Sequence, residues 1–129
     1  MKEKKRILII EDEKALQEVL RDRLIEEGFE VMEALDGDEG IRKMQEFTPD
    51  LLLLDIILPR KDGFFVLNAL RKKDIKKHIP IIVITNLADE PNLEKIQSYF
   101  LDSDHCLVKS DTSLAEIIEF IKKTLTHKS

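Results

Sequence analysis

Hydrophobic and polar positions alternate along the chain in two kinds of block, short apolar runs and longer amphipathic segments. Three runs are uninterrupted and rich in branched side chains, namely Ile7–Ile10, Leu51–Leu54 and Ile81–Ile84. Such runs are typical of strands buried on both faces, as in a parallel sheet covered by helices. Phe29–Ala34 alternates apolar with acidic residues, which predicts a strand at the edge of the sheet. Cys106–Val108 is expected to be a shorter fifth strand.

The segments between these runs carry apolar residues at helical spacing. The first predicted helix has a stripe of five apolar residues: Leu16, Val19, Leu20, Leu24 and Ile25. Gly28 follows this stripe as a C-terminal cap. Four further helices are predicted around similar stripes: Ile41–Phe47, Phe64–Leu70, Pro91–Phe100 and Leu114–Leu125. Ser113 and Glu116 have the spacing of a capping box at the start of the last helix.

Five strands that alternate with five helices predict an α/β fold with a doubly wound, open parallel sheet. In such sheets the functional crevice lies at the carboxyl ends of the strands, where the strand order reverses. Four strands end in polar residues, at Glu11–Glu13, Asp55, Thr85–Asn86 and Lys109–Ser110. The strand order of this kind of fold places the first, third, fourth and fifth strands next to one another, so their polar ends are expected to converge in one small pocket.

Asp55 is the most informative of these residues, because a carboxylate directly follows four leucines. Pro59 and Gly63 indicate that the chain breaks into a loop just beyond it. A carboxylate held at the mouth of a sheet can bind a metal or attack an electrophile. The ordinary alternative is an aspartate that starts a turn or caps a helix.

The pocket predicts a site for a hard cation. Carboxylates within a few ångströms of one another repel, which raises their pKa values unless a cation neutralises them. Oxygen ligands with retained water suit Mg²⁺. Asp12 and Asp55 are the expected direct ligands, Glu11 is expected to act through water, and the backbone carbonyl of Ile57 is a further candidate. The three histidines have no ligand spacing that would indicate zinc or copper.

The same pocket is suited to phosphoryl transfer. Lys109, together with the metal, would neutralise an incoming phosphoryl group while Asp55 attacks phosphorus. Thr85 offers a hydroxyl that could donate to a phosphoryl oxygen.

Composition narrows the class of protein. The 129 residues, 43% hydrophobic and 36% charged, suit one compact domain with a solvated exterior. The net charge of -5 argues against a nucleic-acid binder. A single cysteine, Cys106, excludes an internal disulfide and fits a reducing compartment. No apolar stretch approaches the roughly 20 residues of a membrane span and no signal peptide is evident, so a cytoplasmic location is expected.

These residues resemble the receiver domain of response regulators, the CheY-like family of two-component signalling, along essentially the whole chain. The matching positions are the acidic pair Glu11–Asp12, the acceptor Asp55, Pro59 and Gly63 after it, Thr85, and Lys109. The resemblance implies a flavodoxin-like (βα)5 fold with sheet order 2-1-3-4-5. It also implies an acyl phosphate on Asp55, received in the presence of Mg²⁺ from the phosphohistidine of a sensor kinase or phosphotransfer protein. Such a protein catalyses its own phosphorylation and dephosphorylation and is not otherwise an enzyme.

Several positions depart from the pattern of this family, and three of them bear on the site. Cys106 stands where Tyr or Phe usually reports phosphorylation by rotating, which puts that coupling in question; it is either an apolar filler or a redox-sensing thiol. Asn86 replaces a common Ala, and it either hydrogen-bonds the phosphoryl group or partly covers it. Ser110 replaces the usual Pro after Lys109, and because a cis peptide there would cost about 3 kcal/mol, a trans peptide is expected.

Two further positions bear on the lifetime of the phosphoryl group. Ile57 and Leu87 are places where polar side chains in relatives position the hydrolytic water, and both are apolar here. Slow self-dephosphorylation is therefore predicted.

The leading interpretation is a single receiver domain over residues 1–129, without an output domain, because few residues follow the last helix. It would signal to an unknown downstream protein or pass the phosphoryl group on, as a monomer or weak homodimer. A Mg²⁺-dependent phosphohydrolase is disfavoured, because Ile57 stands where its general acid would be. A receiver-like binding module that no longer becomes phosphorylated is the third interpretation.

Overall fold

Five strands and five α-helices alternate along the part of the chain that the computed structural model describes, residues 4–72, 79–87, 89–100 and 104–126. The strands are β1 (Arg6–Ile10), β2 (Glu30–Ala34), β3 (Leu51–Leu54), β4 (Ile81–Thr85) and β5 (His105–Val108). The helices are α1 (Lys14–Glu26), α2 (Gly37–Phe47), α3 (Gly63–Lys72), α4 (Glu90–Gln97) and α5 (Leu114–Thr126), with a 3-10 turn at Lys109–Asp111.

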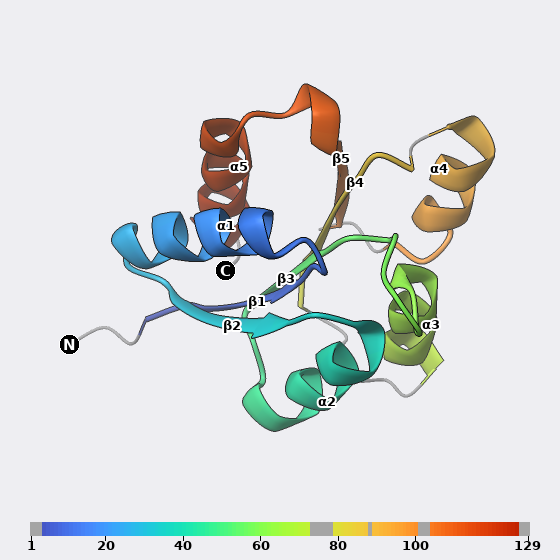
Figure 1. Ribbon diagram of the computed structural model, residues 1–129, viewed down its shortest axis with the longest axis horizontal. Helices are drawn as coiled ribbons and strands as arrows, with labels where there is room; N and C mark the ends of the chain where they lie inside the picture. The colour runs from blue at the N-terminus through green and yellow to red at the C-terminus, as the bar shows by residue number, and fades with distance from the viewer. Residues whose placement is uncertain (1–3, 73–78, 88, 101–103, 127–129) are drawn as a thin grey trace.

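All neighbouring strands pair in parallel, in the order β2-β1-β3-β4-β5 (Figure 1). This order confirms the predicted doubly wound, flavodoxin-like fold. The alternating segment Phe29–Ala34 contains β2, which lies at the edge of the sheet as predicted. The continuous apolar runs form the central strands β1, β3 and β4.

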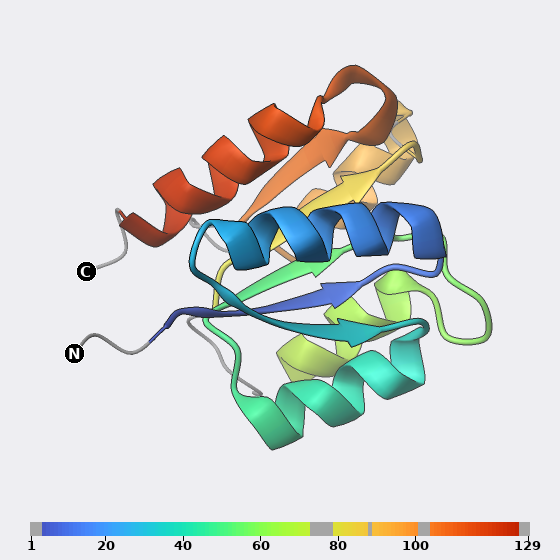
Figure 2. The ribbon, with the colours of Figure 1, turned by 60° about the vertical axis from the view of Figure 1, so that its left-hand side comes forward.

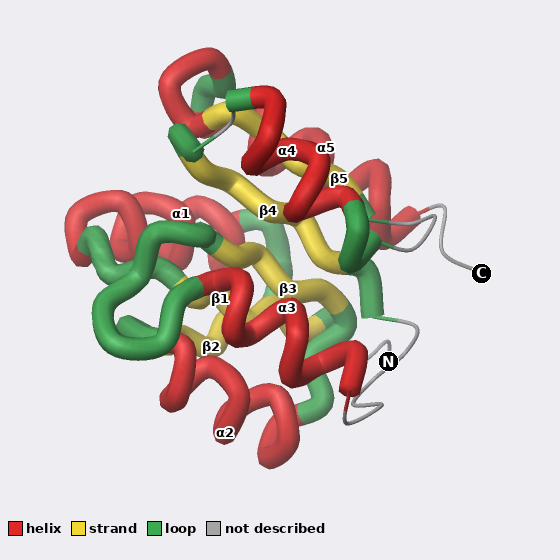
Figure 3. Tube along the Cα trace, turned by 90° about the vertical axis from the view of Figure 1, so that its right-hand side faces the viewer, coloured by secondary structure: helices red, strands yellow, loops and turns green. Residues whose placement is uncertain are grey.

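The helices form two layers, one on each face of the sheet (Figures 2 and 3). Buried residues of α1 and α5 pack on one face, against Ile7 and Ile9 of β1. Buried residues of α2, α3 and α4 pack on the other face, against Leu8 and Ile10. Because successive strand residues point to opposite faces, a strand covered on both sides must be apolar throughout.

The predicted stripe of α1 is partly wrong. Val19 and Ile25 are 48% and 51% exposed, whereas Gln17 is buried. The Gln17 side-chain nitrogen donates hydrogen bonds to the carbonyl oxygens of Ala34, at 2.9 Å, and Glu11, at 3.2 Å. These carbonyls lie where β1 and β2 end, so a polar donor is more useful there than another apolar side chain.

Both predicted caps are confirmed. Gly28 lies just past α1 with a φ of 97°, a left-handed conformation that glycine adopts without steric cost. At α5, the Ser113 N–H donates to Glu116 Oε1 at 2.9 Å, and the Glu116 N–H donates to Ser113 Oγ at 3.1 Å. None of the helices in the described ranges is long and apolar enough to cross a membrane.

Candidate functional site

The strands β1, β3, β4 and β5 are parallel neighbours, so the polar residues that follow them lie at the same, carboxyl end of the sheet, as the strand order predicts. Ile10 pairs with Leu54, so Glu11 and Asp55 follow directly from paired positions on adjacent strands. Thr85 pairs with Val108, which places Lys109 one residue beyond the last pair. The backbone N–H of Asp55 also donates to the carbonyl of Ile10 at 3.0 Å.

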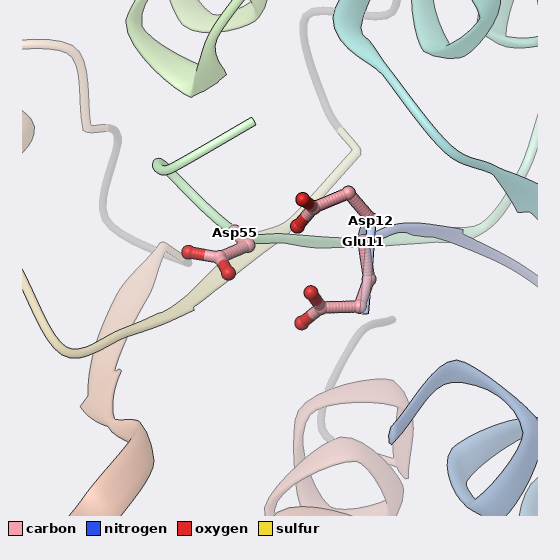
Figure 4. A group of neighbouring side chains, drawn as sticks. All are labelled: Glu11, Asp12 and Asp55. Atoms are coloured by element: carbon pink, nitrogen blue, oxygen red, sulfur yellow. The ribbon is translucent and has the colours of Figure 1, made fainter. Parts of the chain in front are cut away.

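Glu11, Asp12 and Asp55 form an acidic cluster at this edge. Each offers one carboxylate oxygen, and these three oxygens lie within 4.8 Å of one another. Figure 4 shows Glu11 and Asp12 extending from the end of β1 towards Asp55. Glu11 and Asp55 are only 2% and 4% exposed, whereas Asp12 is exposed. The structure therefore brings together the three carboxylates that the sequence singles out.

Lys109 supplies the positive charge of the site. Its Nζ donates to Asp55 Oδ2 at 2.7 Å and lies 3.0 Å from Glu11 Oε1 in an ion pair. Burial by itself would lower the pKa of Lys109, but the hydrogen bond to Asp55 and the negative charges of Asp55 and Glu11 outweigh it and raise this pKa well above the ordinary value. Lys109 is therefore a permanent cation held between two buried carboxylates.

Glu11 combines deep burial with opposing electrostatic effects. Burial raises its pKa, although the hydrogen bond from the Glu13 N–H to Oε2, at 3.0 Å, and the charge of Lys109 oppose this effect. Its Oε1 is buried and accepts no hydrogen bond from the described residues, since Lys109 approaches it as an ion pair without hydrogen-bond alignment. An oxygen in this state, beside two further carboxylates, fits the donor set of a hard divalent cation.

The loop that follows Asp55 is anchored to it. The Ile57 N–H donates to Asp55 Oδ1 at 3.1 Å, while the Ile57 side chain is 55% exposed. This contact fixes the orientation of the Asp55 carboxylate, leaving Oδ2 to Lys109. The role of the Ile57 carbonyl as a metal ligand stays a prediction.

Thr85 and the two residues after it lie on the other side of the site. Thr85 is fully buried, and its hydroxyl oxygen accepts from the Leu87 N–H at 3.2 Å. Leu87 is half-buried and packs on the core. Asn86 is exposed and its side-chain oxygen accepts from the Ser110 N–H at 2.8 Å. All described peptide bonds are trans, including that between Lys109 and Ser110, as expected.

Glu13 is a part of this site that the sequence reasoning did not assign. Its Oε1 lies 3.5 Å from Lys109 Nζ, and its N–H is the donor to Glu11. The sequence signal for Glu13 was its position at the end of the acidic run Glu11–Glu13. This position does not predict the contact with Lys109, because an exposed glutamate has many rotamers.

Cys106 is partly buried and packs against the core cluster that includes α3 and α4. Burial raises the pKa of its thiol, which disfavours the thiolate that reacts with oxidants. The structure therefore favours packing over redox sensing.

Gly63 allows the loop after Asp55 to close. Its N–H donates to the Ile56 carbonyl at 2.8 Å, and a Cβ at this position would lie 2.5 Å from Ile56 Cα and 2.7 Å from the Asp55 carbonyl oxygen. Because these are backbone atoms of Asp55 and Ile56, they can shift only if the backbone around the acceptor shifts with them.

Replacing Gly63 with alanine is expected to lower the free energy of unfolding by about 2–3 kcal/mol, the upper part of the usual range for overpacking. Gly28→Ala is the matched control, because nothing lies within 4 Å of its Cβ and the cost is limited to about 1–2 kcal/mol of left-handed strain. Urea unfolding measures both. Equal losses would show that the contact with Ile56 is relieved at little cost.

Comparison with known proteins agrees with this geometry. A model of the response regulator receiver domain family matches residues 7–123. Response regulator RR06 of Streptococcus pneumoniae is 36% identical over 116 residues, 90% of this chain and 51% of that protein. The phosphate regulon transcriptional regulatory protein PhoB of Rhizobium meliloti is 37% identical over 120 residues, 93% of this chain and 52% of that protein.

Solved structures give the same result. A CheY-like response regulator receiver domain protein from Methanospirillum hungatei has a TM-score of 0.84 and 28% identity, covering 96% of this chain and 95% of that one. The receiver domain of Francisella response regulator 1452 has a TM-score of 0.83 and 25% identity, covering 97% and 99%. The chain belongs to the response regulator receiver domain family.

Membership defines the class of function. Receiver domains of response regulators are signalling modules that interact with histidine kinases and downstream effectors, and they are not conventional enzymes. The chain spans about half the length of the curated relatives it matches, and those proteins include transcriptional regulators.

Proposed function

We propose that this chain is a phosphorylatable switch in which Asp55 accepts a phosphoryl group in a Mg²⁺-dependent reaction. The observation that carries the proposal is the pairing of a buried carboxylate with a half-buried cation beside an acidic cluster. Asp55 Oδ2 lies 2.7 Å from Lys109 Nζ, while Glu11 and Asp12 each place a carboxylate oxygen within 4.8 Å of an Asp55 oxygen.

In the proposed transfer an Asp55 carboxylate oxygen forms a bond to phosphorus as the bond from phosphorus to the donor breaks. With a phosphohistidine donor, the phosphorus–nitrogen bond breaks and the imidazole leaves with the electron pair and takes a proton. No oxidation or reduction occurs. Lys109 is already in place to move from the carboxylate to a phosphoryl oxygen, which stabilises the charge that builds up there.

Glu11, Asp12 and Asp55 would hold Mg²⁺, consistent with their oxygen donors and with the buried Oε1 of Glu11, which accepts no hydrogen bond from the described residues. Bound there, Mg²⁺ would supply positive charge to the phosphoryl oxygens during transfer. Thr85, at the end of β4, offers a hydroxyl for a phosphoryl oxygen.

The donor in the cell would be the phosphohistidine of a sensor kinase or a phosphotransfer protein, and the output would be binding of a downstream protein or onward transfer. The cytoplasmic location, the lack of nucleic-acid binding and the monomer or weak homodimer stay predictions.

Acetyl phosphate and Mg²⁺, with detection by intact-mass spectrometry, test the proposal. The wild-type chain should gain one phosphoryl group, about 80 Da, and the gain should vanish when EDTA removes the metal. No adduct under any condition would contradict the switch and favour a binding module that does not become phosphorylated. Rapid release of phosphate from unrelated monoesters would favour the phosphohydrolase.

The phosphoryl group is expected to be long-lived, with a half-life of minutes or more in the purified protein. Ile57 and Leu87, two residues after Asp55 and Thr85, have apolar side chains, one exposed and one half-buried, so neither can hydrogen-bond a hydrolytic water. Loss of the adduct after removal of acetyl phosphate measures the half-life. Ile57→Asn should shorten it severalfold, because an amide can hydrogen-bond water; a half-life of seconds in the wild type would contradict the prediction.

A further inference from the structure

The two loops that flank the acceptor are joined by one side chain. The Ser110 backbone N–H donates to the side-chain oxygen of Asn86 at 2.8 Å. Asn86 directly follows Thr85, and Ser110 directly follows Lys109. The hydrogen bond therefore links the residues next to two members of the phosphoryl site, although they are 24 positions apart in the sequence.

This contact lies just beyond the last backbone pair of β4 and β5, so strand pairing does not connect the two loops here. The pairing of β4 with β5 ends at Thr85 and Val108, and beyond it β4 runs into a bend while Lys109 starts a 3-10 turn. Thr112 Oγ also donates to the Val108 carbonyl, at 2.7 Å, but that bond stays within the second loop. Asn86 thus continues the link between the two strands past their last backbone pair.

The contact needs an acceptor at position 86 and an N–H at position 110, which every residue except proline provides. Asn86 and Ser110 are two of the departures described above, and they meet in this one bond. The sequence left open whether Asn86 faces the phosphoryl group. In the structure its oxygen is turned to the neighbouring loop.

We propose that Asn86 is a positioning residue, which acts through the Ser110 N–H to hold Lys109 and Thr85 at the spacing that phosphoryl transfer requires. The proposal rests on the proposed function of Asp55. Lys109 Nζ lies 2.7 Å from Asp55 Oδ2 and must contact the phosphoryl group that forms there. Greater freedom of the Lys109 backbone would therefore lower the rate of phosphoryl transfer. The transfer itself is unchanged, with acetate leaving as Asp55 gains the phosphoryl group.

The test is a double-mutant cycle with Asn86→Ala, Ser110→Pro and the double variant. Each protein is incubated with acetyl phosphate at saturating Mg²⁺, and the rate of adduct formation is measured by mass spectrometry. Each single variant should be slowed about three- to tenfold, the range that corresponds to one neutral hydrogen bond. The double variant should be no slower than the slower single variant, because both changes remove the same contact.

Two measurements separate positioning from a general loss of structure. The free energy of unfolding of Asn86→Ala should match that of the wild type, and exchange of the Ser110 amide proton should become faster in this variant. If Asn86→Ala is phosphorylated at the wild-type rate, the proposal is overturned. It is also overturned if the effects of the two substitutions on the rate add up in the double variant, because the effect of Ser110→Pro would then come from the backbone. A Ser110→Ala variant slowed as much as Ser110→Pro would assign the effect to the hydroxyl and also overturn it.

The control for the underlying function is the wild-type chain in the same assay. If it gains no phosphoryl group, the proposed function fails and this inference fails with it. If it gains the group and Asn86→Ala is not slowed, the positioning role alone is wrong.

Discussion

Replacing Asp55 with asparagine is expected to abolish phosphoryl uptake. The amide oxygen lacks the negative charge and nucleophilicity of the carboxylate, and Lys109 loses its closest partner, at 2.7 Å. With acetyl phosphate and Mg²⁺, the wild-type chain should gain about 80 Da and Asp55→Asn should gain nothing over the same time. Intact-mass spectrometry measures both proteins.

Asp22→Asn is the matched control for this experiment. Asp22 is an exposed aspartate of α1 whose carboxylate pairs with Arg21 at 3.0 Å, away from the acidic cluster. The same chemical change there should leave uptake at the wild-type rate. An adduct of equal size on Asp55→Asn would mean that another residue accepts the group, and the assignment of Asp55 would be wrong.

Replacing Lys109 with alanine is expected to slow phosphorylation about a hundredfold or more, the effect of removing one donor that stabilises charge in a transition state. Lys109 holds the two buried carboxylates, Glu11 and Asp55, and no other described lysine or arginine is paired with either. The rate of adduct formation at saturating Mg²⁺ measures the loss. A rate close to that of the wild type would contradict the role given to Lys109.

The same variant should be less stable when metal is absent. Without Lys109, Glu11 and Asp55 are left buried and uncompensated, which we expect to cost about 1–3 kcal/mol because the site is partly open to water. Mg²⁺ should stabilise Lys109→Ala more than the wild type, since the ion then supplies the missing charge. Urea unfolding with EDTA or Mg²⁺ measures this difference.

Lys122→Ala is the matched control for both measurements on Lys109. Lys122 forms an ion pair with Glu27 at 2.9 Å, and its side chain is partly exposed. Pairs of this kind contribute about 0–1 kcal/mol, so its removal should change neither the rate nor the response to Mg²⁺.

Much of the fold follows from local patterns. The runs Ile7–Ile10, Leu51–Leu54 and Ile81–Ile84 became central strands because only strands covered on both faces are apolar at every position. The first helix shows the limit of this reasoning. Hydrophobicity placed Val19 and Ile25 in the core, but Gln17 is buried instead, since strand-end carbonyls need a donor that no helical pattern reveals.

The site was predictable to the extent that strand order determines it. The site residues follow different strands, namely β1 for Glu11 and Asp12, β3 for Asp55 and β5 for Lys109. Parallel pairing brings these strand ends together at the carboxyl end of the sheet, independently of side-chain conformation. The contact of Glu13 with Lys109 was not predictable, because it depends on the rotamer of a flexible side chain.

Local patterns along the chain were enough to predict the strands of the sheet, the polar groups at their carboxyl ends, and Asp55 as the candidate acceptor. The reason is that strand burial and the alternation of strands with helices are properties of short segments. Three features are visible in the three-dimensional contacts alone: Lys109 is shared between Glu11 and Asp55, Glu11 Oε1 accepts no hydrogen bond from the described residues, and the Asn86 side-chain oxygen accepts one from the Ser110 N–H. These contacts join segments distant in the sequence, and whether they form depends on side-chain distances within about an ångström, which strand order alone does not specify.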